Sequence, residues 1–243
     1  MSVIEIRNLT RSYGPGRGVF DLNLSLNAGE IFGFLGPNGA GKTTTMKMIT
    51  GLIPVEQGEV TVMGYNVQLE PGNALRQMGC VLESAELYPY LTAEENLQQV
   101  TRFYPDLPKT RISEALELVG MERYAKEKAK AFSLGMKQRV ALAMAMVHRP
   151  KVLILDEPLN GLDVEGMVLI RRVLQRLAQE EQTTVFISSH LIHDVELTCT
   201  RIGIIVQGVL IKTAETADIM REHPSLESFF INEVNSHSVK SRG

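Results

Sequence analysis

The sequence predicts an α/β protein that combines a mixed-sheet core with an antiparallel β portion and an inserted helical lobe. A short apolar run at 31–35 leads into a glycine-rich loop and then into a segment with helical apolar spacing, the order of a buried parallel strand and its helix. From about residue 84 to 149 the composition becomes helical, which indicates a lobe inserted into the core. The early strands lie close together, which favours antiparallel pairing, and they are expected at 3–9, 19–26 and 58–64.

The glycine-rich loop, Gly36–Thr43, matches the phosphate-binding pattern G-x-x-x-x-G-K-[S/T]. A strand, such a loop and a helix aim backbone N–H groups and the positive end of the helix at one small volume, which suits a polyphosphate. Lys42 is expected to contact the β- and γ-phosphates, and the Thr43 hydroxyl to ligate Mg²⁺. A glycine turn without a ligand is the alternative interpretation. The residues expected to contact the nucleotide here are Gly36, Pro37, Asn38, Gly39, Ala40, Gly41, Lys42, Thr43 and Thr44.

Length and composition limit the classes of function. At 243 residues the chain is long enough for one large domain or for two lobes that share a core. The net charge of −3 gives no basic field, so nucleic acid is not expected as a partner. Cys80 and Cys199 form no metal-binding spacing, which favours a reduced, cytosolic compartment. No apolar run approaches the ~20 residues that span a bilayer, so any action on a membrane requires another chain.

Tyr13 lies in the turn that follows the first expected strand. An aromatic residue in such a turn is more often a surface residue than a ligand, although aromatic residues are enriched at binding sites. The residues alone leave both interpretations of Tyr13 open.

Helix signals mark the lobe. Thr92–Glu95 has the pattern of a capping box at a helix start. A helical apolar face farther along ends at Gly120. Ser133 is expected to cap a long helix that Pro150 ends, and an ordinary capped helix is the simplest interpretation of this segment.

The run at 152–155 is apolar and leads directly into Asp156 and Glu157. A buried parallel strand delivers its last residues to the ligand-binding edge of the sheet, where an acid meets the magnesium of the phosphate loop. Asp156 fits the ion site and Glu157 fits a general base on water, with solvated charges as the alternative. His190 follows the next strand, 183–188, so it is expected at the same edge.

Four other histidines occur in polar or boundary settings and are expected to be solvated: His148, His193, His223 and His237. The sequence is expected to form a single domain over 1–243, with a core at about 1–83 and 150–234, the lobe at about 84–149, and a flexible polar tail at 235–243.

The order of these motifs resembles that of the ATP-binding subunit of an ABC transporter, from Val3 to about Ala214. The resemblance implies a P-loop NTPase core with a RecA-like mixed sheet. It further implies a Walker A motif at Gly36–Thr43, a Walker B motif at Leu153–Asp156, a signature at Ser133–Lys137, a D-loop at Asn160–Asp163, the catalytic base Glu157, the switch histidine His190 and the adenine-stacking Tyr13.

In this family two subunits lie head to tail, with ATP between the Walker A motif of one and the signature of the other. The resemblance therefore implies that Ser133 and Gly135, together with Asp163, contact the nucleotide at such an interface. It implies ATP and Mg²⁺ as cofactors, a membrane permease in a separate chain, a second ATPase subunit that is identical or different, and a place on the cytoplasmic face of the membrane. The implied catalytic residues are Lys42, Glu157 and His190, and the implied Mg²⁺ ligands are Thr43, Asp156 and Glu83.

Two positions depart from the family pattern. Leu134 replaces the first glycine of the signature, with Met136–Lys137 where glycine–glutamine is usual, and Glu83 replaces the Q-loop glutamine. Both departures are similar to those of bacitracin and lantibiotic self-protection exporters. The leading hypothesis is therefore an ATPase subunit that powers export of peptide antibiotics or other drugs. A soluble ABC-type ATPase of an assembly complex, such as iron–sulfur assembly, is the alternative, and the partner, polytopic or soluble, distinguishes the two.

Overall fold

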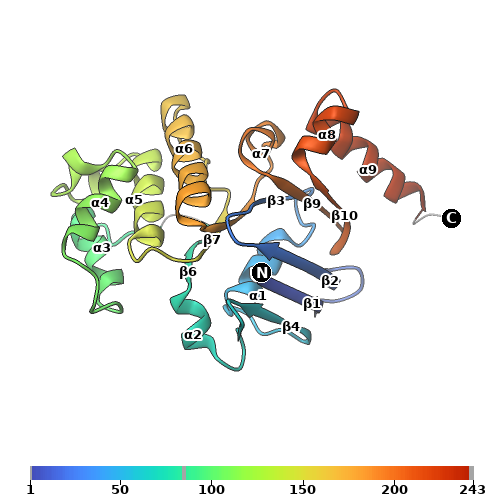
Figure 1. Ribbon diagram of the computed structural model, residues 1–243, viewed down its shortest axis with the longest axis horizontal. Helices are drawn as coiled ribbons and strands as arrows, with labels where there is room; N and C mark the ends of the chain where they lie inside the picture. Colours follow the sequence, from blue (N-terminus) through green and yellow to red (C-terminus); the bar gives the residue numbers. More distant parts are fainter. Residues whose placement is uncertain (1, 84–85, 241–243) are drawn as a thin grey trace.

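The computed structural model describes residues 2–83 and 86–240, and it contains two sheets with helices around them (Figure 1). The larger sheet has six strands in the order β10-β9-β3-β8-β7-β6. Five of them, from β9 to β6, run parallel, and β10 pairs antiparallel with β9 at one edge. Their bounds are β3 Ile31–Leu35, β6 Met78–Val81, β7 Val152–Asp156, β8 Thr184–Ser188, β9 Arg201–Val206 and β10 Val209–Glu215.

The smaller sheet is antiparallel and has the order β2-β1-β4-β5. It confirms the expected antiparallel portion, since its strands are β1 Ser2–Ser12, β2 Gly18–Asn27, β4 Gln57–Val62 and β5 Tyr65–Asn66. Alternate residues of β2 are buried, which is the pattern of a strand with one face on a core.

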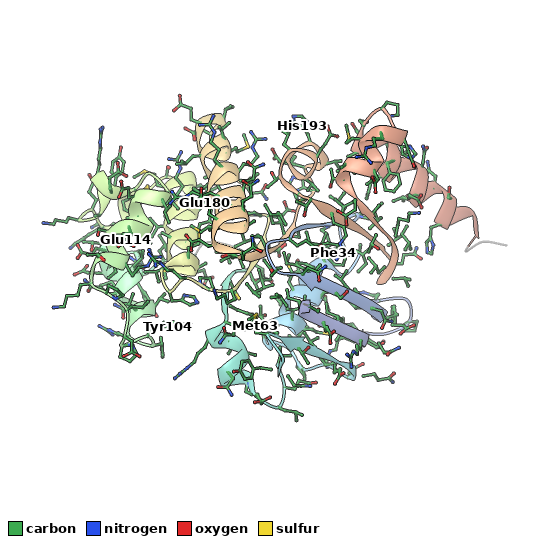
Figure 2. The ribbon with its side chains drawn as sticks, viewed as in Figure 1. Phe34, Met63, Tyr104, Glu114, Glu180 and His193 are labelled. Carbon is green, nitrogen blue, oxygen red and sulfur yellow. The ribbon has the colours of Figure 1, made fainter. Side chains whose placement is uncertain are left out.

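The helix α1, Lys42–Ile49, contributes to the core between the two sheets. Alternate residues of the parallel strands face this core, and the rings of Phe32 and Phe34 lie 5.4 and 5.3 Å from that of Phe186. Figure 2 shows Phe34 beside the strands of the smaller sheet. The helix that follows the glycine loop is therefore fixed by apolar packing, which holds its first turn at the end of β3.

The helical lobe consists of α3 Ala93–Thr101, α4 Thr110–Leu118 and α5 Leu134–Met146, and it lies at one end of the molecule (Figure 1). The capping box at Thr92–Glu95 is present, with both of its reciprocal hydrogen bonds. Ser133 caps α5 as expected. The lobe joins the large sheet closely, because a Cβ at Gly79 of β6 would lie 1.9 Å from the carbonyl oxygen of Ala145 in α5.

His148 differs from its expected solvated state. It is half-buried, its ring stacks on that of Tyr104 at 4.3 Å, and its Nε2 lies 3.0 Å from the carbonyl oxygen of Met78. Burial lowers the pKa of His148, and the hydrogen bond to Met78 opposes that shift in part. The contact joins three segments far apart in sequence, so local composition around His148 did not reveal it.

The remaining α-helices pack against strands of the large sheet. They are α2 Pro71–Arg76, α6 Val164–Glu181, α7 Ile192–Thr198, α8 Thr216–Glu222 and α9 Leu226–Lys240. The last of these continues through most of the segment expected as a flexible tail, because residues 235–240 contain neither proline nor glycine to end it. Within residues 2–83 and 86–240, no helix combines the length and the apolar character needed to cross a bilayer.

Candidate active site

A cavity of about 440 Å³ brings the predicted phosphate loop, Tyr13 and the two acids after β7 together. The β1–β2 turn forms one wall, the glycine loop and the start of α1 form the floor, and the end of β7 closes the other side. The lining residues are Tyr13, Gly16, Arg17, Gly18, Asn38, Gly39, Gly41, Lys42, Thr43, Thr44, Asp156 and Glu157.

The backbone of the loop has the conformation that its glycines permit. Gly39 and Gly41 have φ angles of 79° and 111°, in the left-handed region that side chains disfavour. A Cβ at Gly36 would lie 2.4 Å from the carbonyl oxygen of Ile205, so β9 leaves no room for a side chain there. No side chain caps α1, whose first-turn N–H groups therefore stay available to an anion.

Lys42 is buried at the floor of the cavity, where its Nζ donates to the carbonyl oxygens of Gly36 at 2.7 Å and Pro37 at 3.3 Å. Burial lowers the pKa of Lys42, and the nearby carboxylates of Glu157 and Asp156 act in the opposite direction. The ammonium thus lies against the loop carbonyls, beside the position where a phosphate would attract it.

Asp156 ends β7 and is buried. Its Oδ2 accepts a hydrogen bond from Thr43 Oγ1 at 2.9 Å, and its Oδ1 accepts one from Ser188 Oγ. Ser188 was not among the predicted site residues. The parallel pairing of β7 with β8 sets Ser188 directly beside Asp156, so the signal was the last residue of the neighbouring strand.

Glu157 and His190 meet at the same edge. The Oε2 of Glu157 accepts hydrogen bonds from Nδ1–H of His190 at 2.8 Å and from its backbone N–H at 3.3 Å. The backbone N–H of Glu157 donates to the carbonyl oxygen of Ser188 at 3.1 Å. Glu157 has a φ angle of 52°, an uncommon conformation for a residue with a side chain, and these contacts hold it there.

Tyr13 lines the cavity from the β1–β2 turn and is half-exposed. The guanidinium carbon of Arg11 lies 5.3 Å from the centroid of its ring, and Arg11 in turn pairs with Glu56 at 3.3 Å. A cation on one face of the ring leaves the other face for a planar ligand.

The signature residues lie elsewhere. Ser133 is exposed at the start of α5, where its Oγ accepts from the N–H of Met136 at 3.2 Å, and neither it nor Gly135 lines the cavity. Gly135 and its neighbour Leu134 instead lie against Gly161 of the predicted D-loop. A Cβ at Gly135 would lie 2.8 Å from the carbonyl oxygen of Gly161, and one at Gly161 would lie 2.6 Å from a methyl of Leu134.

Two further contacts tie α5 to the segment 158–163, which contains the D-loop. Gln138 is buried and donates from Nε2 to the carbonyl oxygen of Pro158 at 3.2 Å. Arg139 pairs with Asp163 at 2.9 Å. Asp163 also caps α6 through the N–H of Gly166, and this hydrogen bond, with Arg139, holds the pKa of Asp163 below its usual value. Asp163 is thus separated from the cavity, as Ser133 is.

Glu83 does not join the predicted magnesium ligands in this conformation. Its exposed carboxylate pairs with Lys47 of α1, and it lines the groove beside β6 rather than the cavity. Across residues 2–83 and 86–240, no three histidine, cysteine, aspartate or glutamate side chains cluster in a way that could hold a metal ion.

Comparison with known proteins connects this arrangement to a family. A family model described as "ABC transporter" matches residues 19–160. The chain belongs to the ABC transporter family. Its members include the bacitracin transport ATP-binding protein BcrA of Bacillus licheniformis, which is 38% identical over 98% of this chain and 78% of its own length. The lantibiotic transport ATP-binding protein SrtF of Streptococcus pyogenes is 35% identical over 96% of this chain and 97% of its own.

Solved structures give the same assignment. An ATP-binding subunit of an ABC transporter superimposes with a TM-score of 0.85 at 27% identity, covering 96% of this chain and 99% of the other. A dimeric ATP-binding cassette in a post-hydrolysis state, bound to ADP and Pi, superimposes with a TM-score of 0.81 at 27% identity, covering 88% and 98%. This ABC protein is an ATPase with the P-loop NTPase fold.

Proposed function

We propose that this ABC protein is the subunit that powers a separate membrane permease, and that the permease exports peptide antibiotics such as bacitracin or lantibiotics, or other drugs. The observation that carries the proposal is the similarity over nearly the whole chain to subunits named for bacitracin and lantibiotic transport. The chain then acts at the cytoplasmic face of the membrane, attached through its partner.

The cavity provides the groups that ATP hydrolysis needs. The amides of the loop and Lys42 bind the β- and γ-phosphates, and Tyr13 stacks on adenine. The oxygens of Thr43 and Asp156, already 2.9 Å apart, are the hard donors that Mg²⁺ prefers. When bound, Mg²⁺ neutralises charge on the phosphates. Glu157 takes a proton from the attacking water, and His190 orients the carboxylate through the 2.8 Å hydrogen bond.

The site is completed by a second ATPase subunit, identical or different. Ser133 and Gly135 belong to an exposed helix start that lies outside the cavity of their own chain. Such a helix start attracts an anion, so it suits the γ-phosphate held by a partner. The ties between α5 and Asp163 of the D-loop move both elements together when the partner binds.

An apolar groove supplies a surface for the permease. It lies between α2 and the helical lobe, encloses about 870 Å³, and exposes Leu75, Tyr88 and Phe103. An exposed apolar surface of this kind is typical of a protein contact. Glu83 lines the adjoining groove and pairs with Lys47 of the helix that follows the phosphate loop. Glu83 therefore couples the nucleotide site to the permease, and as a Mg²⁺ ligand it would first leave Lys47.

A pull-down of the tagged chain from its native membranes in mild detergent tests the proposal. We expect a polytopic membrane protein in stoichiometric amount, and we expect bacitracin or a lantibiotic to raise the ATPase rate of the reconstituted complex. Recovery with soluble partners alone would contradict the permease and support an assembly ATPase. A permease whose complex is not stimulated by any peptide antibiotic would retain the transporter and reject the cargo class.

A further inference from the structure

Arg17 is a cavity residue for which the motifs give no role. It lines the same cavity as Lys42 and Thr43. Over residues 2–83 and 86–240, its guanidinium makes no hydrogen bond and no ion pair. An arginine with five free donors therefore lies on the wall of a pocket built for an anion.

The backbone holds Arg17 in a defined place. The β1–β2 pairing ends at Ser12 and Gly18, so Arg17 is the last residue of the turn and directly precedes β2. Its carbonyl oxygen accepts from the N–H of Tyr13 at 2.8 Å, and its own N–H donates to Gly14 at 3.1 Å. A turn closed by two backbone hydrogen bonds loses little further backbone entropy on binding, so the entropic cost of the contact is mainly that of ordering the Arg17 side chain.

The same turn packs directly on the phosphate loop. The carbonyl oxygen of Gly18 lies 3.2 Å from the position of a Cβ at Gly41, and 2.3 Å from that of a Cβ at Gly208. A side chain at Gly208 would have no room there, and one at Gly41 would be tightly packed. Arg17, which precedes Gly18, therefore lies at the edge of the phosphate loop.

The charges of the cavity leave a role for a second cation. Lys42 is buried and its Nζ already donates to the carbonyl oxygens of Gly36 and Pro37, while Asp156 and Glu157 bring two carboxylates to the cavity. A nucleoside triphosphate adds several negative charges at this place. A planar guanidinium, which remains charged at all working pH values and grips phosphate oxygens in a fork, suits the deficit.

We propose that Arg17 binds a phosphate oxygen of the nucleotide held in its own chain. The inference rests on the proposed placement of the phosphates at the loop Gly36–Thr43. It adds an affinity determinant from the β1–β2 turn, separate from the stacking of Tyr13.

Isothermal titration of the purified chain with Mg-ATP and Mg-ADP tests the contact, using Arg17→Ala, Arg17→Lys and the wild type. Arg7→Ala is the matched control, because Arg7 lies exposed on β1, pairs only with Glu5 and Glu59 among the described residues, and is outside the cavity. We expect Arg17→Ala to raise the Kd for ATP about five- to tenfold at low salt. We expect Arg17→Lys to recover part of that loss, since it keeps the charge without the fork.

Salt and the number of phosphates separate a phosphate contact from a structural role. The difference in Kd between Arg17→Ala and the wild type should shrink in about 0.5 M salt, because screening weakens the contact that the wild type makes and the variant lacks. The same difference in Kd should be smaller for AMP than for ATP. A Kd within about twofold of the wild type, a loss that salt does not change, or an equal loss in Arg7→Ala would overturn the proposal. If the wild type itself bound no nucleotide, the phosphate-loop assignment would fail instead.

Discussion

Glu157 is held at the sheet edge by its neighbours rather than by its own backbone preference. Its left-handed φ of 52° is disfavoured for a glutamate, and the hydrogen bonds from Glu157 to Ser188 and from His190 to Glu157 maintain it. The Glu157 side chain is three-quarters buried and lines the same cavity as Lys42. Pre-organisation of this kind serves a base that must meet water in one orientation.

Replacing Glu157 by glutamine should separate binding from turnover. The amide keeps the volume and the contact with His190 but cannot accept a proton, so kcat should fall at least about a hundredfold. The Kd for ATP should stay within about twofold of the wild type, since the base acts only in the transition state. Phosphate release and isothermal titration measure the two. Glu165→Gln, an exposed site on α6, is the control, and an unchanged rate in Glu157→Gln would remove Glu157 as the base.

Tyr13 should contribute through its ring and not through its hydroxyl. Tyr13→Phe should bind ATP like the wild type, whereas Tyr13→Ala should raise the Kd about tenfold, because stacking is lost. Arg11→Ala removes the cation over the ring and should raise the Kd by about two- to fivefold. Titration with ATP measures all three. Equal affinity in Tyr13→Ala and the wild type would return Tyr13 to an ordinary turn residue.

At the same scale, contiguous motifs were predictable and cross-strand partners were not. Lys42, Asp156 and Glu157 follow from local pattern, since the strand end and the loop carry their own signals. Ser188 depends on which strand becomes the neighbour of β7, and the structure places β8 there. Local spacing contains no information about that order.

Among the secondary-structure elements, the packing of α4 against α5 depends on Arg111. This arginine is buried, donates from Nε to the carbonyl oxygen of Val147 at 3.1 Å and from Nη2 to that of Met146 at 3.3 Å, and pairs with Glu114. Figure 2 shows Glu114 in the helical lobe. The guanidinium thereby satisfies two carbonyl groups at the C-terminus of α5.

Removing that guanidinium should destabilise the protein more than removing an exposed one. Arg111→Ala leaves buried carbonyl groups without a donor, so the free energy of unfolding should fall by about 2 kcal/mol. Arg172→Ala, an exposed change on α6, should stay within about 0.5 kcal/mol. Urea unfolding followed by circular dichroism measures both. Similar midpoints for the two variants would show that Arg111 does not hold the helices together.

The sequence predicted correctly two helices whose starts carry a capping residue. The capping box at Thr92 and the cap at Ser133 satisfy backbone groups within one turn, so the pattern and the structure coincide. The helix α2 spans six residues that include a proline and a glycine, and it has no apolar period to reveal it. The helix α9 continues past Asn235 because its polar residues do not break a helix, although their composition is typical of a tail.

At the scale of the whole molecule, the cavity and the signature are presented by different parts of the chain. The cavity lies between the two sheets and the end of β7, while α5 begins in the helical lobe at one end of the molecule (Figure 1). The contacts of Gln138 with Pro158 and of Arg139 with Asp163 fix that lobe to the core. The motifs indicated the members of both groups, and the family resemblance implied an interface between two chains. The fold adds that Ser133 and Gly135 lie outside the cavity of their own chain.

This separation predicts that two defective chains repair one another. A Lys42→Ala chain keeps its signature, and a Ser133→Arg chain keeps its phosphate loop, so a mixed head-to-tail dimer contains one complete site. Each variant alone should hydrolyse ATP at background rate. In an equimolar mixture half of the dimers are mixed, and we expect about a quarter of the wild-type rate if identical chains pair with two-fold symmetry.

The control for this mixture is the chain that carries both substitutions. In a mixture of this chain with either single variant, every site lacks Lys42, Ser133 or both, so the rate should stay at background. Phosphate release at a fixed total concentration of chain measures the recovery, and sizing in the presence of ATP confirms that dimers are present. Dimers without any recovered rate would contradict a site shared between identical chains. Recovery that persists at concentrations where only monomers remain would contradict it as well, because a complete site requires the partner's Ser133.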